Sequence, residues 1–275
     1  MLSRIFLCAL CIFHFRLSSQ IYDCFIFFNE LDLLEIRFNE LNEHVDKFVL
    51  VESVETFTGH PKPMYFDINK ERFQKFWDKI IYVPLYERQN TTSAWAREEY
   101  QRNQISRGLT SCNQFDIIMI SDVDEIPRKS SINWIDQKIK EKPLSVVCEQ
   151  NLYRFFLNYY DYKISPWLGT FATYYTTLKS KSPHQLRLER IHFRTISNAG
   201  WHFSSLGGLE KWIEKIESFS HTEVNLPEHK NTQFIRSYLT QNCKLTPIDE
   251  TFPDFVKCNL GRFRDLGFIE IAAEE

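Results

Sequence analysis

Three carboxylates directly follow an apolar run near the middle of the chain. Residues 115–120 read Phe-Asp-Ile-Ile-Met-Ile, and Asp122, Asp124 and Glu125 come next. The branched residues predict a strand buried on both faces, and Pro127 is expected to end it. The carboxylates then share the carboxyl edge of a sheet, where their repulsion requires a hard cation or a set of donors among them. An Asp-x-Asp pair here is typical of transferases that hold Mn²⁺ or Mg²⁺ against a nucleotide-sugar diphosphate. The alternative is an Asp-rich turn that caps the strand.

His202 is a second candidate metal ligand. It follows Gly200 and Trp201, and the glycine allows close approach of the backbone. A lone histidine is usually structural, but neutral imidazole binds Mn²⁺ readily, whereas Mg²⁺ prefers oxygen ligands. If the acidic motif holds a cation, His202 would complete the site. Mn²⁺ is then the preferred ion and Mg²⁺ the alternative.

The first part of the chain predicts a β-α-β-α-β order. Residues 21–28, 48–51 and 80–85 read as strands, and residues 30–41 and 66–77 have helical patterns. Ligands of such sheets collect where the strands end.

Two residues beyond the second strand are candidate nucleotide contacts. Glu52 ends that strand, and Thr56 lies in the loop 54–63, which could cradle a base and ribose. The alternative is a plain surface loop.

Two arginines are candidate diphosphate contacts. Arg97 and Arg102 lie on a predicted helix, residues 93–109, and a guanidinium offers a planar fork of donors to phosphate oxygens. Alternatively, each arginine is solvated or paired with a neighbouring glutamate. With a further helix at 132–140 and a strand at 144–149, the pattern predicts one α/β domain with a Rossmann-like sheet flanked by helices.

Composition excludes some classes of function. The net charge of −3 and the absence of a basic stripe argue against nucleic-acid binding. Aromatic residues make up 15% of the chain, which fits either an aromatic core or exposed rings that stack on sugars.

The N-terminus and the cysteines bear on the compartment. Residues 1–20 combine an apolar run with small residues, which predicts a cleavable signal peptide or a short signal-anchor, and with it possible membrane attachment. Cys24 and Cys148 are expected to be buried thiols, while Cys243 and Cys258 could pair in a secretory lumen. Cys8 and Cys11 lie in the predicted leader, and the other five cysteines have no C-x-x-C spacing, so a zinc site is not expected.

Three segments together resemble glycosyltransferase family 17. They are Ser-Asp-Val-Asp-Glu-Ile-Pro-Arg at 121–128, Ala-Gly-Trp-His-Phe-Ser at 199–204, and the opening Tyr-Asp-Cys-Phe at 22–25 with Val-Leu-Val-Glu at 49–52. The resemblance runs from about residue 21 to residue 275. Family 17 is the family of β-1,4-mannosyl-glycoprotein 4-β-N-acetylglucosaminyltransferase, which this sequence resembles.

The resemblance implies a GT-A type fold, a UDP-sugar donor such as UDP-GlcNAc, a divalent cation and a glycan or glycoprotein acceptor. By position, Asp122 would face the ribose or cation, Asp124 would ligate the cation, and His202 would be its distant ligand. The expected location is the Golgi or ER of a eukaryote, or otherwise the cytoplasm. An inactive glycan-binding relative, or a transferase with another donor or acceptor, is the alternative.

Inverting transfer requires a carboxylate that takes the acceptor proton. Glu149, Asp161 and Glu189 are the candidates, and the sequence does not choose among them.

Overall fold

The structure is a computed structural model, and residues 19–142 and 144–270 are described. Nearly all of the predicted leader, with Cys8 and Cys11, lies outside the described residues, so the leader stays a prediction. Within the described part of the chain, no helix is both long and apolar enough to cross a bilayer.

Strands and helices alternate through the first half of the chain and mix less regularly in the second. The first half holds β1 Ile21–Phe27, α1 Leu31–Leu41, β2 Lys47–Ser53, α2 Tyr65–Asn69, β3 Ile80–Leu85, α3 Ala94–Asn103, β4 Ile117–Asp122, β5 Glu125–Pro127 and α4 Lys129–Glu141. The second half holds β6 Val146–Arg154, β7 Tyr159–Asp161, β8 Trp167–Tyr174, α5 Pro183–Glu189, β9 Arg194–Ser204, α6 Gly208–Ser218, α7 Thr232–Asn242, β10 Cys243–Leu245, α8 Asp254–Cys258 and α9 Leu260–Asp265.

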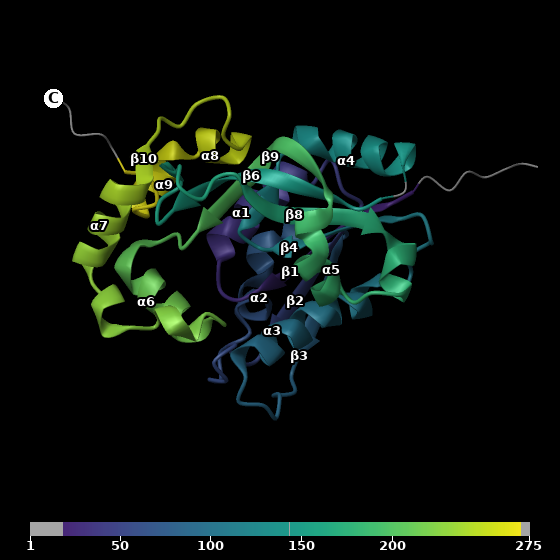
Figure 1. Ribbon diagram of the computed structural model, residues 1–275, viewed down its shortest axis with the longest axis horizontal. Coiled ribbons are helices and arrows are strands. Elements are labelled where there is room, and N and C mark those ends of the chain that lie inside the picture. The colour runs from purple at the N-terminus through teal and green to yellow at the C-terminus, as the bar shows by residue number, and fades with distance from the viewer. Residues whose placement is uncertain (1–18, 143, 271–275) are drawn as a thin grey trace, which may run out of the picture.

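One mixed sheet runs through the molecule, with helices on both sides (Figure 1). Its main strand order is β10-β7-β6-β8-β4-β1-β2-β3, and β9 pairs with both β6 and β5. Strands β1, β2, β3 and β4 are parallel, whereas β8 is antiparallel to β4 and β6. The predicted α/β class, a mixed sheet flanked by helices in one domain, is confirmed.

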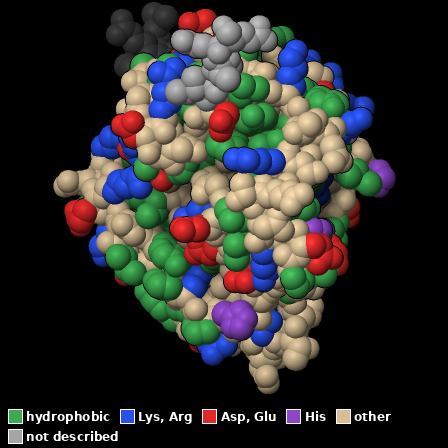
Figure 2. Space-filling view, turned by 90° about the vertical axis from the view of Figure 1, so that its left-hand side faces the viewer, with side chains coloured by type: hydrophobic (Ala, Val, Ile, Leu, Met, Phe, Trp, Pro, Cys, Tyr) green, Lys and Arg blue, Asp and Glu red, His purple; other side chains and the backbone are tan. Residues whose placement is uncertain are grey.

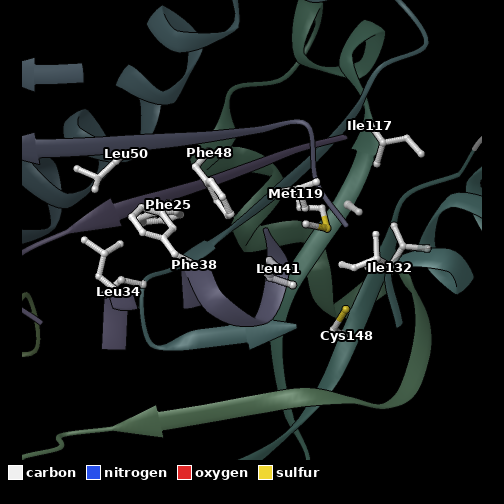
Figure 3. Packing of buried hydrophobic residues seen from close by; sticks show 14 of the residues in the cluster. Phe25, Leu34, Phe38, Leu41, Phe48, Leu50, Ile117, Met119, Ile132 and Cys148 are labelled. Atoms are coloured by element: carbon white, nitrogen blue, oxygen red, sulfur yellow. The ribbon is translucent and has the colours of Figure 1, made fainter. Parts of the chain in front are cut away.

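The sheet is buried because alternate side chains of its strands meet helices on opposite faces. Phe25 and Phe27 of β1 belong to the cluster that α1 and α4 cover, and Cys24 and Ile26 belong to the cluster on the other face. Figure 3 shows Phe38 of α1 lying against the first face. Burying each such aromatic or branched side chain stabilises the fold by about 1.5–3 kcal/mol.

Two expectations need correction. Pro127 does not end the strand of the acidic motif, because β4 ends at Asp122 and Pro127 closes the separate strand β5. Among the described residues, β5 pairs with β9 alone, and proline is tolerated at such an edge. The helix predicted at 66–77 is α2 followed by a 3₁₀ helix, Lys70–Phe76.

The cysteines follow the prediction in part. Cys24 and Cys148 are buried thiols, as expected. Cys243 and Cys258 are both free, so the disulfide considered between them is not formed.

Candidate functional site

The acidic motif forms a turn at the carboxyl end of β4. Asp122 is the last residue of β4, Asp124 lies in the turn, and Glu125 opens β5. β4 is parallel to β1, with Ile26 opposite Asp122. The three carboxylates therefore lie at the sheet edge that the sequence predicts, near the end of β1 as well.

A buried arginine fixes the backbone of this turn. Arg37 of α1 is fully buried and binds the carboxylate of Asp23 through Nε and Nη2, at 2.7 and 2.5 Å. Its Nη2 donates to Ser121 Oγ at 2.6 Å. Its Nη1 donates to the carbonyl oxygens of Asp122 and Glu125, each at 3.0 Å. One side chain thus ties α1, β1 and both ends of the acidic turn together.

Two further arginines hold the first and last carboxylates. Arg102 of α3 lies 2.7 Å from Asp122 Oδ1, and Arg187 of α5 lies 2.9 Å from Asp122 Oδ2. Arg187 also binds Glu125, at 2.5 and 2.6 Å, and Trp167 Nε1 donates to Glu125 Oε1 at 2.6 Å.

Burial alone would raise the pKa of the Asp122 carboxyl, but Arg102 and Arg187 outweigh it and lower this pKa to about 2. Part of the repulsion within the motif is therefore balanced by fixed donors.

The middle carboxylate has a different environment. Asp124 Oδ2 lies 3.4 Å from His202 Nε2 and 3.3 Å from the ammonium of Lys215. Burial alone would raise the pKa of the Asp124 carboxyl, but His202 and Lys215 outweigh it and hold this pKa below its usual range. Glu30, before α1, is a neighbouring acid, and burial together with the charge of Asp124 raises its pKa. Within the described residues, Asp124 is thus the carboxylate of the motif that has no arginine partner.

Strand pairing brings His202 to the motif. β5 and β9 are antiparallel, and Glu125 lies opposite His202. Phe203 N donates to the carbonyl oxygen of Asp124 at 3.0 Å. Gly200 is required for this approach, because a Cβ there would lie 2.2 Å from the carbonyl oxygen of Ile126. Residues 199–204, which the sequence singled out, are therefore an integral part of the site.

Packing rather than a second hydrogen bond orients the His202 ring. Its centroid lies 5.1 Å from that of Trp167. Its Nδ1 is buried and has no hydrogen-bond partner among the described residues, whereas Nε2 faces Asp124. The nitrogen that faces the carboxylate is the one available as a ligand.

A cavity of 580 Å³ lies between the loop after β2 and helix α6. The loop is tied to α6, since Phe57 N donates to Ser218 O at 3.0 Å and Thr58 Oγ1 donates to Glu217 O at 2.8 Å. Figure 2 shows the face that carries α6 and α7, with acidic and basic side chains close together across its middle. The residues that line the cavity include Phe28, Thr56, His60, Tyr65, Glu217 and Asn225.

Of the two candidate nucleotide contacts, one lines the cavity and the other is buried in the protein. Thr56 lines the cavity, and its Oγ1 accepts from His60 N at 3.0 Å. Glu52 is fully buried and is bound by Lys62 Nζ at 3.1 Å and Tyr82 Oη at 2.8 Å. Glu52 therefore supports the cavity through Lys62, which lines it.

The two candidate arginines bind protein groups. Arg97 Nη1 donates to Phe57 O at 3.3 Å, and its Nε lies 3.4 Å from Glu55 Oε2, so Arg97 braces the loop after β2. Arg102 pairs with Asp122, as described above, and with Glu98 at 2.7 Å. The alternative of pairing with a neighbouring glutamate fits Arg102, whereas the glutamate beside Arg97 comes from the distant loop after β2.

The three candidate bases have other partners. Glu149 Oε2 accepts from Ser197 Oγ at 2.6 Å, the fully buried Asp161 accepts from Tyr238 Oη at 2.7 Å, and Glu189 pairs with Lys181 at 2.5 Å. Within residues 19–142 and 144–270, no hydrogen bond links any of them to the acidic motif. The structure does not bring them together with Asp124.

The sequence interpretation missed Arg37, Arg187 and Lys215. A signal for Arg37 exists, because it lies three residues after Leu34 and four before Leu41, which places a charge on the apolar side of the helix. Arg187 lies in a seven-residue helix and Lys215 in an amphipathic one, and neither pattern indicates a contact with the motif.

The family model described as glycosyltransferase family 17 matches residues 2–261. The human and rat beta-1,4-mannosyl-glycoprotein 4-beta-N-acetylglucosaminyltransferases are each 30% identical over 139 residues, which is 46% of this chain and 26% of theirs. The mouse enzyme of that name is 29% identical over the same length. The matched region thus covers about a quarter of these curated relatives.

Among solved structures, a Pyrobaculum calidifontis mannosyltransferase in complex with GDP-Man and Mn²⁺ is similar over 81% of this chain and 70% of that chain, at 12% identity and a TM-score of 0.44. Glucosyl-3-phosphoglycerate synthase of Mycobacterium tuberculosis is similar over 68% and 72%, at 13% identity and a TM-score of 0.39.

Proposed function

Because the chain belongs to glycosyltransferase family 17, we propose that it transfers N-acetylglucosamine from UDP-N-acetylglucosamine to a mannose-containing glycan. The new linkage is β, formed with inversion at the anomeric carbon. The N-acetylglucosaminyltransferases described above match 46% of this chain. Their similarity supports the proposed donor and acceptor as that of distant relatives. The observation that carries it is the pairing of Asp124 with His202 at the carboxyl edge of the sheet.

Asp124 and His202 fit a divalent cation. A carboxylate oxygen and an imidazole nitrogen face each other at 3.4 Å, and a positive charge, the Lys215 ammonium, already stands beside the same oxygen. Each oxygen of Asp122 already accepts a hydrogen bond from an arginine, so Asp124 is the freer carboxylate for a direct ligand.

Within the described residues, no group of three histidine, cysteine or acidic side chains converges on a metal position. If a cation binds here, water and oxygens of the donor diphosphate would supply its remaining ligands, as is common for Mg²⁺ and Mn²⁺ at phosphate sites. The imidazole favours Mn²⁺. When bound, the cation supplies neutralisation of the charge that grows on the departing diphosphate.

The chain's own residues bind and orient. The cavity beside α6 is large enough for the nucleoside part of the donor, and Thr56 and Tyr65 offer hydroxyls along its wall. Arg102 and Arg187 hold Asp122 in its ionised form between β4 and the helices. The acidic turn therefore needs little rearrangement when the donor arrives, which favours catalysis.

The proposal is tested by UDP-N-acetylglucosamine turnover with and without Mn²⁺, followed as UDP release. The wild type is compared with Asp124→Asn and with a control, Asp136→Asn. Asp136 is an aspartate on α4 that pairs with Lys140 at 2.7 Å and has no hydrogen bond to the acidic motif among the described residues. We expect Mn²⁺-dependent release that falls by at least about 100-fold in Asp124→Asn, the scale of a lost charge-stabilising group, and is unchanged in the control.

Absence of UDP release together with absence of Mn²⁺-dependent UDP binding would refute the catalytic proposal. That outcome would favour a glycan-binding relative. Release with another UDP-sugar in place of UDP-N-acetylglucosamine would refute the donor alone. Acceptors are then screened among mannose-containing N-glycan cores.

A further inference from the structure

Lys215 stands where positive charge from a cation would stand. Its Nζ lies 3.3 Å from Asp124 Oδ2 and 3.4 Å from Ser204 Oγ. His202 Nε2 lies 3.4 Å from the same carboxylate oxygen. The ammonium and a divalent cation ligated by Asp124 and His202 would therefore compete for one oxygen.

The helix that carries Lys215 is fixed by apolar packing. α6 buries Trp212 and Ile216 in a cluster that includes Phe155 and Ile235. The lysine side chain is 28% exposed and reaches from this helix to the acidic turn. An ammonium on a flexible four-carbon stem can change partners while its helix stays in place.

The turn before α6 keeps Lys215 and His202 in one unit. β9 ends with His202, Phe203 and Ser204, and Ser205 and Gly207 follow with φ values of 61° and 109°. These positive φ values make a compact turn directly before the helix. A Cβ at Gly207 would lie 2.8 Å from Lys211 Cγ, so the turn packs tightly against α6. The proposed metal ligand and the competing ammonium are thus set by the same short segment.

The same helix borders the cavity. Glu214 and Glu217, on either side of Lys215 in sequence, line it together with Phe28 and Thr56. A nucleoside diphosphate with its nucleoside in the cavity and its phosphates at Asp124 would therefore pass along α6. Lys215 is the cation of that helix that already lies beside Asp124.

We propose that Lys215 holds Asp124 while no metal is bound, yields it when a divalent cation binds, and then donates to a diphosphate oxygen of the donor. This inference rests on the proposed function. It assigns Lys215 two roles with opposite effects, since the ammonium weakens metal binding before the donor arrives and strengthens donor binding afterwards.

The first measurement is Mn²⁺ binding without nucleotide, by isothermal titration calorimetry, for the wild type, Lys215→Met and Lys211→Met. Lys211 is a matched control on the same helix, 53% exposed and paired with Glu214 at 2.7 Å. We expect Lys215→Met to bind Mn²⁺ about fivefold more tightly, which corresponds to the loss of one competing ion pair. The control should match the wild type.

The second measurement is UDP binding at saturating Mn²⁺. Here Lys215→Met should bind about fivefold more weakly, because a charge-assisted contact to a phosphate oxygen is lost. Lys215→Gln, which keeps a polar side chain, should shift both affinities in the same directions and guards against a folding defect of the first variant.

Unchanged Mn²⁺ affinity in both Lys215 variants would overturn the inference while leaving the proposed function in place. Mn²⁺ binding by none of the proteins, with no turnover of the donor, would overturn the proposed function as well. Tighter Mn²⁺ binding with unchanged UDP binding would overturn the second role of Lys215.

Discussion

Arg37 should be among the most costly side chains to remove. In Arg37→Met the carboxylate of Asp23, which is fully buried, loses its bidentate partner, and the carbonyl oxygens of Asp122 and Glu125 lose a donor. Breaking a buried ion pair by removing one partner costs about 3–5 kcal/mol. We expect a loss of this size in the free energy of unfolding, measured by urea denaturation followed by circular dichroism.

The double variant Asp23→Asn with Arg37→Met measures the interaction energy between Asp23 and Arg37, apart from their contacts with other residues. Because neither charge is then left alone, the double variant should cost at least about 2 kcal/mol less than the sum of the two single variants. Arg72→Met is the control, since Arg72 binds Asp32 and Glu35 but is 29% exposed. It should cost no more than about 1 kcal/mol. A cost below about 1 kcal/mol for Arg37→Met, or strict additivity of the two variants, would refute this account of the acidic turn.

Two further predictions concern the same site. Gly200→Ala should lower the free energy of unfolding by about 1–3 kcal/mol or more through overpacking against Ile126 O, whereas Gly261→Ala in α9, where a Cβ meets open space, should cost nothing in the same urea titration. Asp122 has a folded pKa of about 2, below its ordinary value near 4, so its contribution to stability is full above about pH 4 and is lost as the pH falls towards 2. Asp122→Asn should therefore be about 1–2 kcal/mol less stable than the wild type at pH 7, and most of this difference should be lost near pH 2; a constant difference across this range would contradict the assignment.

The sheet was largely predictable because its strands are apolar runs of ordinary length. Residues 21–28, 48–51 and 80–85 are strands within a few residues of the prediction. The prediction for Pro127 was wrong because proline ends a central strand, whereas β5 is an edge segment that pairs with β9 alone in the described part of the chain. Whether a strand is central or at an edge is a property of the whole sheet.

The acidic turn was located by sequence, but its partners were not. Asp122, Asp124 and His202 stand out because their type and setting are unusual for an apolar strand and its edge. Arg187 and Lys215 lie more than 60 residues beyond the motif in helices whose patterns describe only their own packing. Their pairing with Glu125 and Asp124 depends on how α5 and α6 return to the sheet, which no local spacing encodes.

The short turn between β9 and α6 also bears on how such chains can change in length. Because His202 and Lys215 are joined through one compact segment, deleting a single residue at 205–207 would force α6 to begin one residue later, or to shift relative to β9. A change of one residue in helix register turns the side chains by about 100°. The ammonium would then leave the acidic turn, and the buried side of α6 would leave its cluster. This part of the chain should accept altered side chains far more readily than insertions or deletions, whereas a loop such as 88–92, outside any helix or strand, can vary in length with less consequence for the sheet.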